Sequence, residues 1–189
     1  MHEALSIYVA AMGYAPSVAK RRAPMWAEHA LRQGWRGVGA VLPERAEPPS
    51  RAETSQLAPV LGAHLAPLVG VAYGYSGAPE QWWYKQVHAG LEAHHGPMGA
   101  DHILEDYFEL TELHVHPEAQ GQGVGNALIG ALLDARPESS VLLSTPEIAE
   151  EDNRAWRLYR RLGFADVLRD FHFDGDPRPF AVLGRELPL

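Results

Sequence analysis

Short apolar runs separated by turn-forming residues recur along the chain and predict the strands of a sheet. The runs occupy residues 5–11, 35–42, 65–76, 102–116, 140–145, 164–173 and 178–187. Several of them combine β-branched and aromatic side chains, which favour strands. Glycine, proline or aspartate lies near most of their ends, where turns are expected. The pattern predicts about seven strands.

Helical periodicity dominates the intervals between these runs. Residues 16–34 form a helical stretch that Pro24 interrupts, which predicts two helices or one broken helix. Within residues 79–96 apolar side chains recur every four positions and predict an amphipathic helix. A last helix is expected over residues 150–162, because Gly163 stands just beyond it and glycine commonly ends a helix.

A glycine-spaced turn, Gln120-Gly121-Gln122-Gly123-Val124-Gly125, follows the fourth run and leads into a further helix. Leu128 and Leu132 recur at helical spacing, so the glycines lie in the first turn of that helix. The first N–H groups of a helix lack partners, and its dipole favours an anion there. Glycines let a phosphate approach those groups, so the segment predicts an anion site. A structural turn without a ligand is the alternative.

Two phosphate-binding loops of known spacing do not fit this turn. The dinucleotide-binding pattern G-x-G-x-x-G would need its third glycine at Asn126 or at Leu128. The P-loop would need Gly-Lys-Ser/Thr, and the turn contains no lysine. The turn therefore belongs to neither class.

The turn does match the pattern Gln/Arg-x-x-Gly-x-Gly/Ala, placed after a strand that carries Val-x-Pro. Gln120, Gly123 and Gly125 fall on its three defining positions, and Val115 and Pro117 occupy the expected places upstream. At these residues the chain resembles the GCN5-related N-acetyltransferase (GNAT) superfamily.

A second motif strengthens the resemblance. Ala155, Tyr159 and Gly163-Phe164 match the family's Ala-x-x-x-Tyr-x-x-x-Gly-Phe, a helix that runs into the next strand. The family's asparagine usually stands three residues before the alanine, where this chain has Asp152, with Asn153 one place later. This departure puts the role of the asparagine in doubt.

The resemblance implies the GNAT fold, an α/β (α+β) domain with a mixed, mostly antiparallel central sheet of about seven strands and helices on both faces. In that fold strands four and five splay around acetyl-CoA. Residues 1–189 would form one such domain, with an exposed loop at about 43–59 and an inserted helix at about 79–96. The inserted helix is less usual in the family, so the resemblance does not predict how the acceptor binds.

The resemblance also implies acetyl-CoA (coenzyme A) as co-substrate. Its diphosphate would lie on the glycine turn, and its pantetheine arm would bind main-chain groups of the fourth strand, with the thioester carbonyl near the Val115 amide. The residues implied in this binding are Leu113, His114, Val115, Gln120, Gly121, Gln122, Gly123, Val124, Gly125, Asn126, Asn153 and Tyr159. For Asn153, a helix cap by it or by Asp152 is an alternative that stays open.

Catalytic roles follow from the same resemblance. Tyr159 would protonate the departing thiolate, since a phenol with a pKa near ~10 stays protonated at neutral pH; packing against the sheet is its alternative role. Glu112 and Glu109 are the candidate bases, with Glu112 preferred. They face opposite sides of a regular strand unless a bulge shifts the parity. His114 or His116 is a further alternative base.

Composition narrows the class of protein. The 189 residues and 46% hydrophobic content suit a globular domain. The absence of cysteine excludes disulfides, thiolate metal sites and a cysteine nucleophile. The formal net charge of −8 argues against nucleic acid as the main partner and would favour a cationic acceptor, although acidity can also serve solubility.

Location and metal content are also expectations from the sequence. No apolar run is long enough for a membrane span, so we expect no membrane partner and a cytoplasmic protein. His114 and His116 share a strand face, but no third ligand has a recognisable spacing, so no metal is expected.

These observations predict an acetyl-CoA-dependent N-acetyltransferase that acetylates a primary amine of a small molecule by direct attack in a ternary complex. No cysteine is available for an acyl-enzyme. A protein or peptide N-acetyltransferase and a non-catalytic acyl-CoA sensor are the alternatives. The helix with Trp82 and Trp83 would wall the acceptor pocket, contact a second copy in a homodimer, or fill the core.

Overall fold

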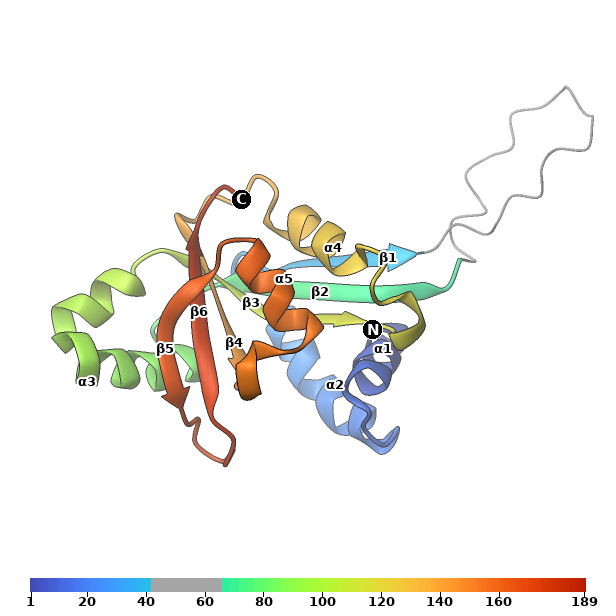
Figure 1. Cartoon of the computed structure of the whole chain (residues 1–189), viewed down its shortest axis with the longest axis horizontal. Coiled ribbons are helices and arrows are strands. Elements are labelled where there is room, and N and C mark those ends of the chain that lie inside the picture. Colours follow the sequence, from blue (N-terminus) through green and yellow to red (C-terminus); the bar gives the residue numbers. More distant parts are fainter. Residues whose placement is uncertain (42–65) are drawn as a thin grey trace, which may run out of the picture.

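The computed structural model describes residues 1–41 and 66–189, arranged as helices around a sheet (Figure 1). The predicted loop at 43–59 lies outside the described residues. The elements in chain order are α1 (His2–Met12), α2 (Ser17–His29), β1 (Arg36–Val41), β2 (Leu68–Ser76), α3 (Trp82–Ile103), β3 (Tyr107–Val115), η2 (Pro117–Ala119), α4 (Val124–Leu133), β4 (Ser140–Pro146), η3 (Ala149–Glu151), α5 (Arg154–Arg161), β5 (Ala165–Phe171) and β6 (Phe180–Glu186).

The described strands form one six-stranded sheet with the order β1-β2-β3-β4-β6-β5. Every neighbouring pair is antiparallel except β3 and β4, which run parallel. The expected mixed, mostly antiparallel sheet is therefore confirmed, with one strand fewer than the seven apolar runs suggested.

The missing strand is the first one. Residues 5–11 were predicted as a strand, and this prediction is wrong because they lie within helix α1. A short apolar run does not distinguish a strand from a helix by itself. Leu5 and Tyr8, three residues apart, are both buried on one side of α1 and pack against β2. Tertiary packing thus overrides the strand preference of the β-branched and aromatic residues.

Two further boundaries differ from the sequence prediction. The stretch 16–34 contains one helix, α2, which continues through Pro24. The amphipathic helix α3 continues to Ile103 after a break at Gly96, so the prediction that the next strand begins at His102 is wrong. The glycine-proline pair ends the first helical segment, and a second short segment follows it.

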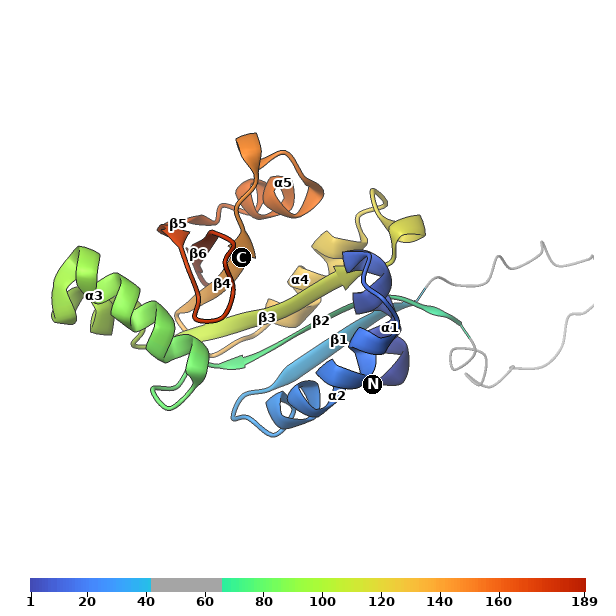
Figure 2. The ribbon, with the colours of Figure 1, turned by 90° about the horizontal axis from the view of Figure 1, so that it is seen from below.

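Helices cover both faces of the sheet, as Figure 2 shows. Side chains of β2 alternate between them: Ala72 packs with α4 and α5, whereas Val71, Tyr73 and Tyr75 pack with α1 and α2. Alternation of this kind is what a strand buried on both sides requires. A third apolar cluster joins α3 to β5 and β6. Within the described residues, none of the helices has the length and apolarity needed to cross a membrane.

The parallel pair β3 and β4 stays together for only part of its length. The two strands pair at Tyr107, Phe108 and Glu109, whereas β3 continues alone on that side to Val115. The expected splay of these two strands is thus present. It leaves one edge of β3 without a neighbouring strand, and backbone polar groups at such an edge need other partners.

Candidate functional site

A cavity of about 830 Å³ opens at the splayed end of β3. It lies between the last residues of β3, the glycine turn and α5, with the end of α1 at its rim. Its lining residues are Ala11, Met12, Leu113, His114, Val115, Ala119, Gln120, Gly121, Gly123, Val124, Gly125, Asn126, Asn153, Arg154, Ala155, Arg157, Leu158 and Arg161. Most of the predicted cofactor-binding residues therefore line one cavity. Gln122 and Tyr159 do not line it.

The glycine turn presents open backbone at the start of α4. Gly121 and Gly123 have φ angles of 78° and 82°, a region that side chains disfavour. A Cβ atom at either position would meet no other atom within 4 Å, so the space in front of the turn is open. Gly123 caps α4 without a side-chain hydrogen bond, which leaves the first N–H groups of the helix available to an anion.

Gln120 connects the turn to both walls of the cavity. Its amide nitrogen Nε2 donates to the Val115 carbonyl oxygen at 3.0 Å, and its oxygen Oε1 accepts from the Arg154 guanidinium at 2.7 Å. One side chain therefore joins β3 to α5 across the gap between the separated strands. Gln122 instead donates to the Glu118 carbonyl at 3.1 Å, outside the cavity lining.

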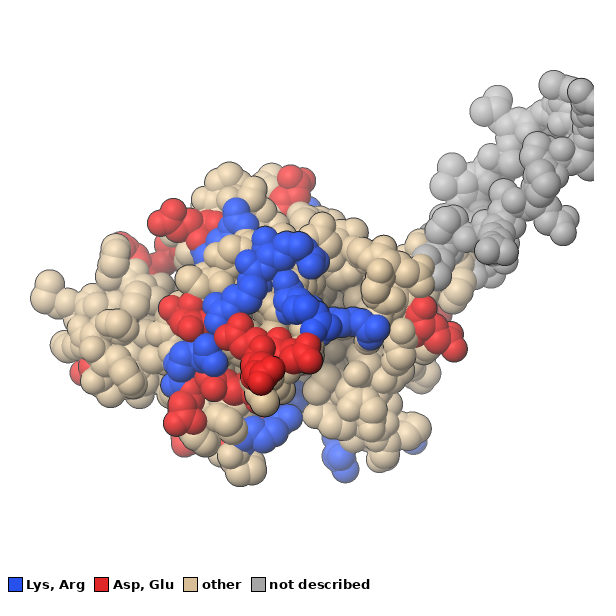
Figure 3. Space-filling model, in the orientation of Figure 1, with Lys and Arg blue, Asp and Glu red and all other residues tan. Residues whose placement is uncertain are grey.

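Three arginines of α5, Arg154, Arg157 and Arg161, line the cavity. Figure 3 shows basic side chains gathered over α5 on a protein of formal charge −8. These arginines were not among the predicted cofactor-binding residues. The available signal was their spacing of three and four residues directly before and within the second motif, which places them on one side.

Backbone amides at the open edge of β3 face the gap between β3 and β4. The His116 amide donates to the Val69 carbonyl oxygen at 2.8 Å, on the side of β2. Because successive residues of a strand point their backbone groups in alternate directions, the amides of Leu113 and Val115 face the opposite side, toward the gap. The side chains of Leu113 and Val115 pack against the main core, as expected.

Asn153 has a structural role that the sequence left open. It is the N-cap of α5, and its side-chain oxygen Oδ1 accepts from the Trp156 amide at 2.9 Å. Asn153 also lines the cavity, so its amide nitrogen remains as a donor toward a ligand. Asp152 forms an ion pair with Arg157 and does not cap the helix.

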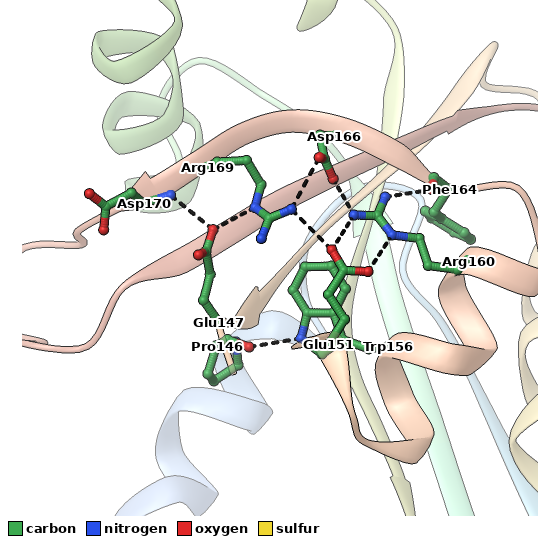
Figure 4. A network of polar contacts seen from close by, with 9 residues as sticks. All are labelled: Pro146, Glu147, Glu151, Trp156, Arg160, Phe164, Asp166, Arg169 and Asp170. Carbon is green, nitrogen blue, oxygen red and sulfur yellow. Dashed lines mark hydrogen bonds and ion pairs between the residues drawn. The ribbon is translucent and has the colours of Figure 1, made fainter. Parts of the chain in front are cut away.

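An ion-pair network fixes α5 and the turn before it against β5 (Figure 4). Glu151 accepts from Arg160 at 2.6 and 2.8 Å and from Arg169 at 3.0 Å, while Asp166 pairs with both arginines. The two guanidinium groups lie over the buried Trp156 ring, at 5.0 and 5.2 Å from its centroid. Networks hold geometry better than single exposed pairs, so α5 keeps its orientation at the cavity.

Glu112 is held by two side chains on the α1 and α2 face of the sheet. The Trp26 indole donates to Glu112 Oε1 at 3.2 Å, and His114 Nε2 lies 2.5 Å from Glu112 Oε2. The Tyr8 ring packs edge-on against the imidazole, with centroids 4.9 Å apart. The Glu112 side chain is 11% exposed, so it remains within reach of solvent.

A bulge places both candidate bases on this face. Tyr73 pairs with Glu112 while the next residue, Gly74, pairs with Leu110, so Thr111 is an extra residue in β3. Glu112 and Glu109 therefore lie opposite two residues of β2 that are two apart, and their side chains share one side. The sequence alone left this parity open.

Glu109 is more deeply placed than Glu112. It is 3% exposed, and its oxygen Oε1 accepts from the Tyr75 hydroxyl at 3.1 Å, while Oε2 has no partner among the described residues. Burial raises the pKa of the Glu109 carboxyl to about 7, against the smaller effect of the hydrogen bond from Tyr75. Glu109 does not line the cavity.

Tyr159 lies on α5 among the core side chains, 7% exposed. Burial raises the pKa of its hydroxyl above the ordinary value, and the charge of Glu112 adds to this effect. The phenol is therefore protonated at neutral pH. Three side-chain polar atoms of the described residues are fully buried and lack a hydrogen-bond partner. The Tyr159 hydroxyl is not among them.

In the described part of the chain, no group of three histidine or acidic side chains is placed to hold a metal ion. His116 accepts instead from the Glu118 amide at 3.4 Å through Nδ1.

Comparison with known proteins decides the family. Residues 83–166 match the family described as Acetyltransferase (GNAT) domain. The chain is 54% identical over 188 residues to a GCN5-like protein acetyltransferase of Mycobacterium tuberculosis, covering 99% of this chain and 91% of the relative. The chain belongs to the GNAT acetyltransferases.

Solved GNAT structures share the fold at low identity. A GNAT-family protein from Desulfovibrio desulfuricans aligns with a TM-score of 0.60 at 16% identity, covering 97% of this chain and 90% of the other. An aminoglycoside 6′-N-acetyltransferase complexed with coenzyme A aligns with a TM-score of 0.57 at 13% identity, covering 99% and 91%. The splayed strands and the glycine turn are both features that the resemblance to the GNAT family implies.

Asn153→Asp separates the two roles of the asparagine. The carboxylate can still accept from the Trp156 amide, so stability in urea should stay within about 0.5 kcal/mol of wild type. The variant loses an amide donor, so the dissociation constant of CoA should rise roughly tenfold if Asn153 binds the ligand. Calorimetry measures this constant. Asn153→Ala, which should also lose about 1 kcal/mol of stability, is the control. Unchanged CoA affinity in both variants would leave Asn153 as a cap alone.

Glu109→Gln tests the buried carboxyl. In the folded protein the Glu109 carboxyl keeps its proton up to about pH 7, because its pKa is raised to about 7. In the unfolded chain the same carboxyl loses its proton near pH 4.5. The free energy of unfolding should therefore fall as pH rises through this window, by about 3 kcal/mol at most from this group. Urea unfolding across the window should show a flatter slope for Glu109→Gln than for wild type, while the exposed control Glu92→Gln keeps the wild-type slope. Equal slopes in all three proteins would contradict the assignment.

Proposed function

We propose that the chain is an acetyl-CoA-dependent N-acetyltransferase that acetylates primary amines of polypeptides by direct attack in a ternary complex. The cavity at the glycine turn is the observation that carries this proposal. Its open amides and three arginines suit the phosphates of CoA, and the unpaired edge of β3 suits the amide-rich pantetheine arm. Membership of the GNAT acetyltransferases supports the chemistry.

Binding would orient the thioester before the reaction. The amides from Gly121 to Gly125 receive the diphosphate at the start of α4, and the β3 amides that face the gap pair with the pantetheine arm. The Val115 amide then donates to the thioester carbonyl oxygen and stabilises the negative charge that develops there. The Val115 carbonyl at this edge already accepts a hydrogen bond from the Gln120 side chain. It therefore needs no neighbouring strand as a partner.

Glu112 is the proposed proton acceptor. Glu112 does not itself line the cavity, but its carboxylate is held by Trp26 and by His114, and His114 does line it. It removes a proton from the acceptor ammonium, directly or through His114, and the free amine forms the new N–C bond. Glu109, the second choice from the sequence, is more deeply buried, and its side-chain partners Tyr75 and Thr111 do not line the cavity.

Tyr159 is the proposed proton donor. As the C–S bond breaks, its hydroxyl gives a proton to the CoA thiolate. The acylated nitrogen releases its second proton to solvent as the amide forms, and a proton from solvent restores the phenol. Burial keeps the hydroxyl protonated beforehand. The charge of Glu112 also raises the pKa of this hydroxyl.

The acceptor class rests on one observation. A relative with 54% identity over nearly the full chain is a protein acetyltransferase, which supports a lysine or other amine of a polypeptide. The small-molecule amine expected from the sequence is the second candidate. The aminoglycoside acetyltransferase of similar fold and the acidic net charge favour it, but fold alone does not transfer a substrate.

Thiol release from acetyl-CoA across a panel of lysine-containing peptides, oligoamines and aminoglycosides tests the proposal. We expect release with peptides, together with mass-spectrometric acetylation of a lysine. Release only with small amines would overturn the polypeptide acceptor and keep the transferase. CoA binding without release for any amine would favour the non-catalytic sensor.

Tyr159→Phe should lower kcat roughly a hundredfold or more with little change in CoA affinity, because it removes only the proton donor. Glu112→Gln should lower kcat to a similar degree, because it removes the proton acceptor. Tyr84→Phe, on α3 and away from the gap, is the matched control. Full turnover by Tyr159→Phe, with the chemical step rate-limiting, would contradict the assigned donor.

A further inference from the structure

A second cavity, of about 820 Å³, lies at the other end of β3. Four segments form it: the end of α2, the turn from β2 to α3, the turn from α3 to β3, and the connection from α4 to β4. It shares no lining residue with the cavity at the glycine turn. Figure 2 shows α3 at one end of β3 and the glycine turn at the other.

The charge of this cavity is opposite to that of the first. Five carboxylates line it against the single guanidinium of Arg32, and they belong to Glu28, Glu80, Glu105, Asp106 and Glu138. Glu138 is neutralised by Arg136, and Glu28 lies 3.6 Å from Arg32. Among the described residues, Glu80 and Asp106 have no ion-pair partner. The cavity therefore carries uncompensated negative charge.

Two buried acceptors in the same cavity also lack partners. The Tyr107 hydroxyl and the Gln81 oxygen Oε1 are two of three sealed side-chain polar atoms without a hydrogen bond in the described part of the chain. Tyr107 is 2% and Gln81 7% exposed, and both residues belong to the cavity lining. Buried polar atoms are nearly always satisfied, so a ligand donor that enters from the cavity would gain a hydrogen bond at either residue.

The arrangement of the carboxylates favours an extended organic cation over a metal ion. No trio of histidine or acidic side chains in the described residues can hold a metal ion, so the charge is spread and not focused. Spread carboxylates suit an extended chain with several ammonium groups. The exposed ring of Trp82 and the exposed side chain of Leu31 provide apolar surface for the methylenes between those groups.

We propose that this acidic cavity binds a linear aliphatic oligoamine, with its ammonium groups on the carboxylates and a donor reaching Tyr107 or Gln81. The site is separate from acetyl transfer, since the two cavities lie at opposite ends of a nine-residue strand, about 26 Å apart along it. It binds the oligoamine in the absence of acetyl-CoA.

Calorimetric titration of the ligand-free full chain with spermidine tests this site. We expect one spermidine per chain, bound about tenfold more weakly by the double variant Glu80→Gln/Glu105→Gln, because two exposed ion pairs to the ligand are lost and each is individually weak. Both side chains are exposed, so the variant should fold normally. The matched control Glu92→Gln/Glu186→Gln removes the same charge at other exposed positions and should bind like wild type.

Tyr107→Phe gives a second, independent readout. Removing an unsatisfied buried hydroxyl should raise the melting temperature of the ligand-free protein and weaken spermidine binding severalfold. A hydroxyl with only a packing role would leave the spermidine affinity unchanged.

Four outcomes would overturn the proposal. They are no spermidine binding, equal weakening in the two double variants, equal affinity for butylamine, and displacement of spermidine by MgCl₂ at matched ionic strength. Loss of binding in Glu112→Gln with retention in Glu80→Gln/Glu105→Gln would place the oligoamine at the acetyl-transfer site instead. Failure of acetyl transfer in the peptide assay leaves this binding test unaffected, so the two proposals fail separately.

Discussion

The early end of the β3 and β4 pairing is the constraint on which the rest of the site depends. Three paired positions hold the strands together, and beyond Glu109 one edge of β3 has no neighbouring strand. Such an edge is costly unless its backbone groups find partners. Gln120 satisfies one carbonyl, and the amides of Leu113 and Val115 remain turned toward the gap. The network around Trp156 keeps α5, the far wall, from closing onto this edge.

The cavities at the two ends of β3 carry charges of opposite sign. The cavity at the glycine turn has arginines on a protein of formal charge −8, whereas the cavity at the start of β3 is lined by carboxylates. Local charge therefore differs from net charge, and each end favours a ligand of the opposite sign. The net acidity read from the composition describes neither site by itself.

The sequence identified the parts of the site that depend on short-range pattern. Gly121, Gly123 and Gly125 were recognisable because glycine at a strand-to-helix junction has few other uses, and the cavity does form in front of them. The parity of Glu109 and Glu112 was not accessible, because it depends on a bulge at Thr111 that only strand pairing with β2 defines.

Long-range packing accounts for the other differences. Residues 5–11 form a helix because Tyr73 and its neighbours on β2 offer an apolar surface to one side of it, and no local pattern encodes that surface. The arginines of α5 were not predicted as cavity residues, because a helical wheel does not show which side faces a cavity. The roles of Tyr159 and Glu112, the cytoplasmic location and the oligomeric state stay predictions.

The most direct test of the account is an NMR titration of the glycine-labelled chain with coenzyme A. If the turn holds the diphosphate, the amide resonances of Gly121, Gly123 and Gly125 will shift together and saturate with one ligand, whereas those of the distant Gly96 and Gly175 will not. Binding of coenzyme A that leaves all three turn glycines unmoved, or no binding at all, would contradict the account.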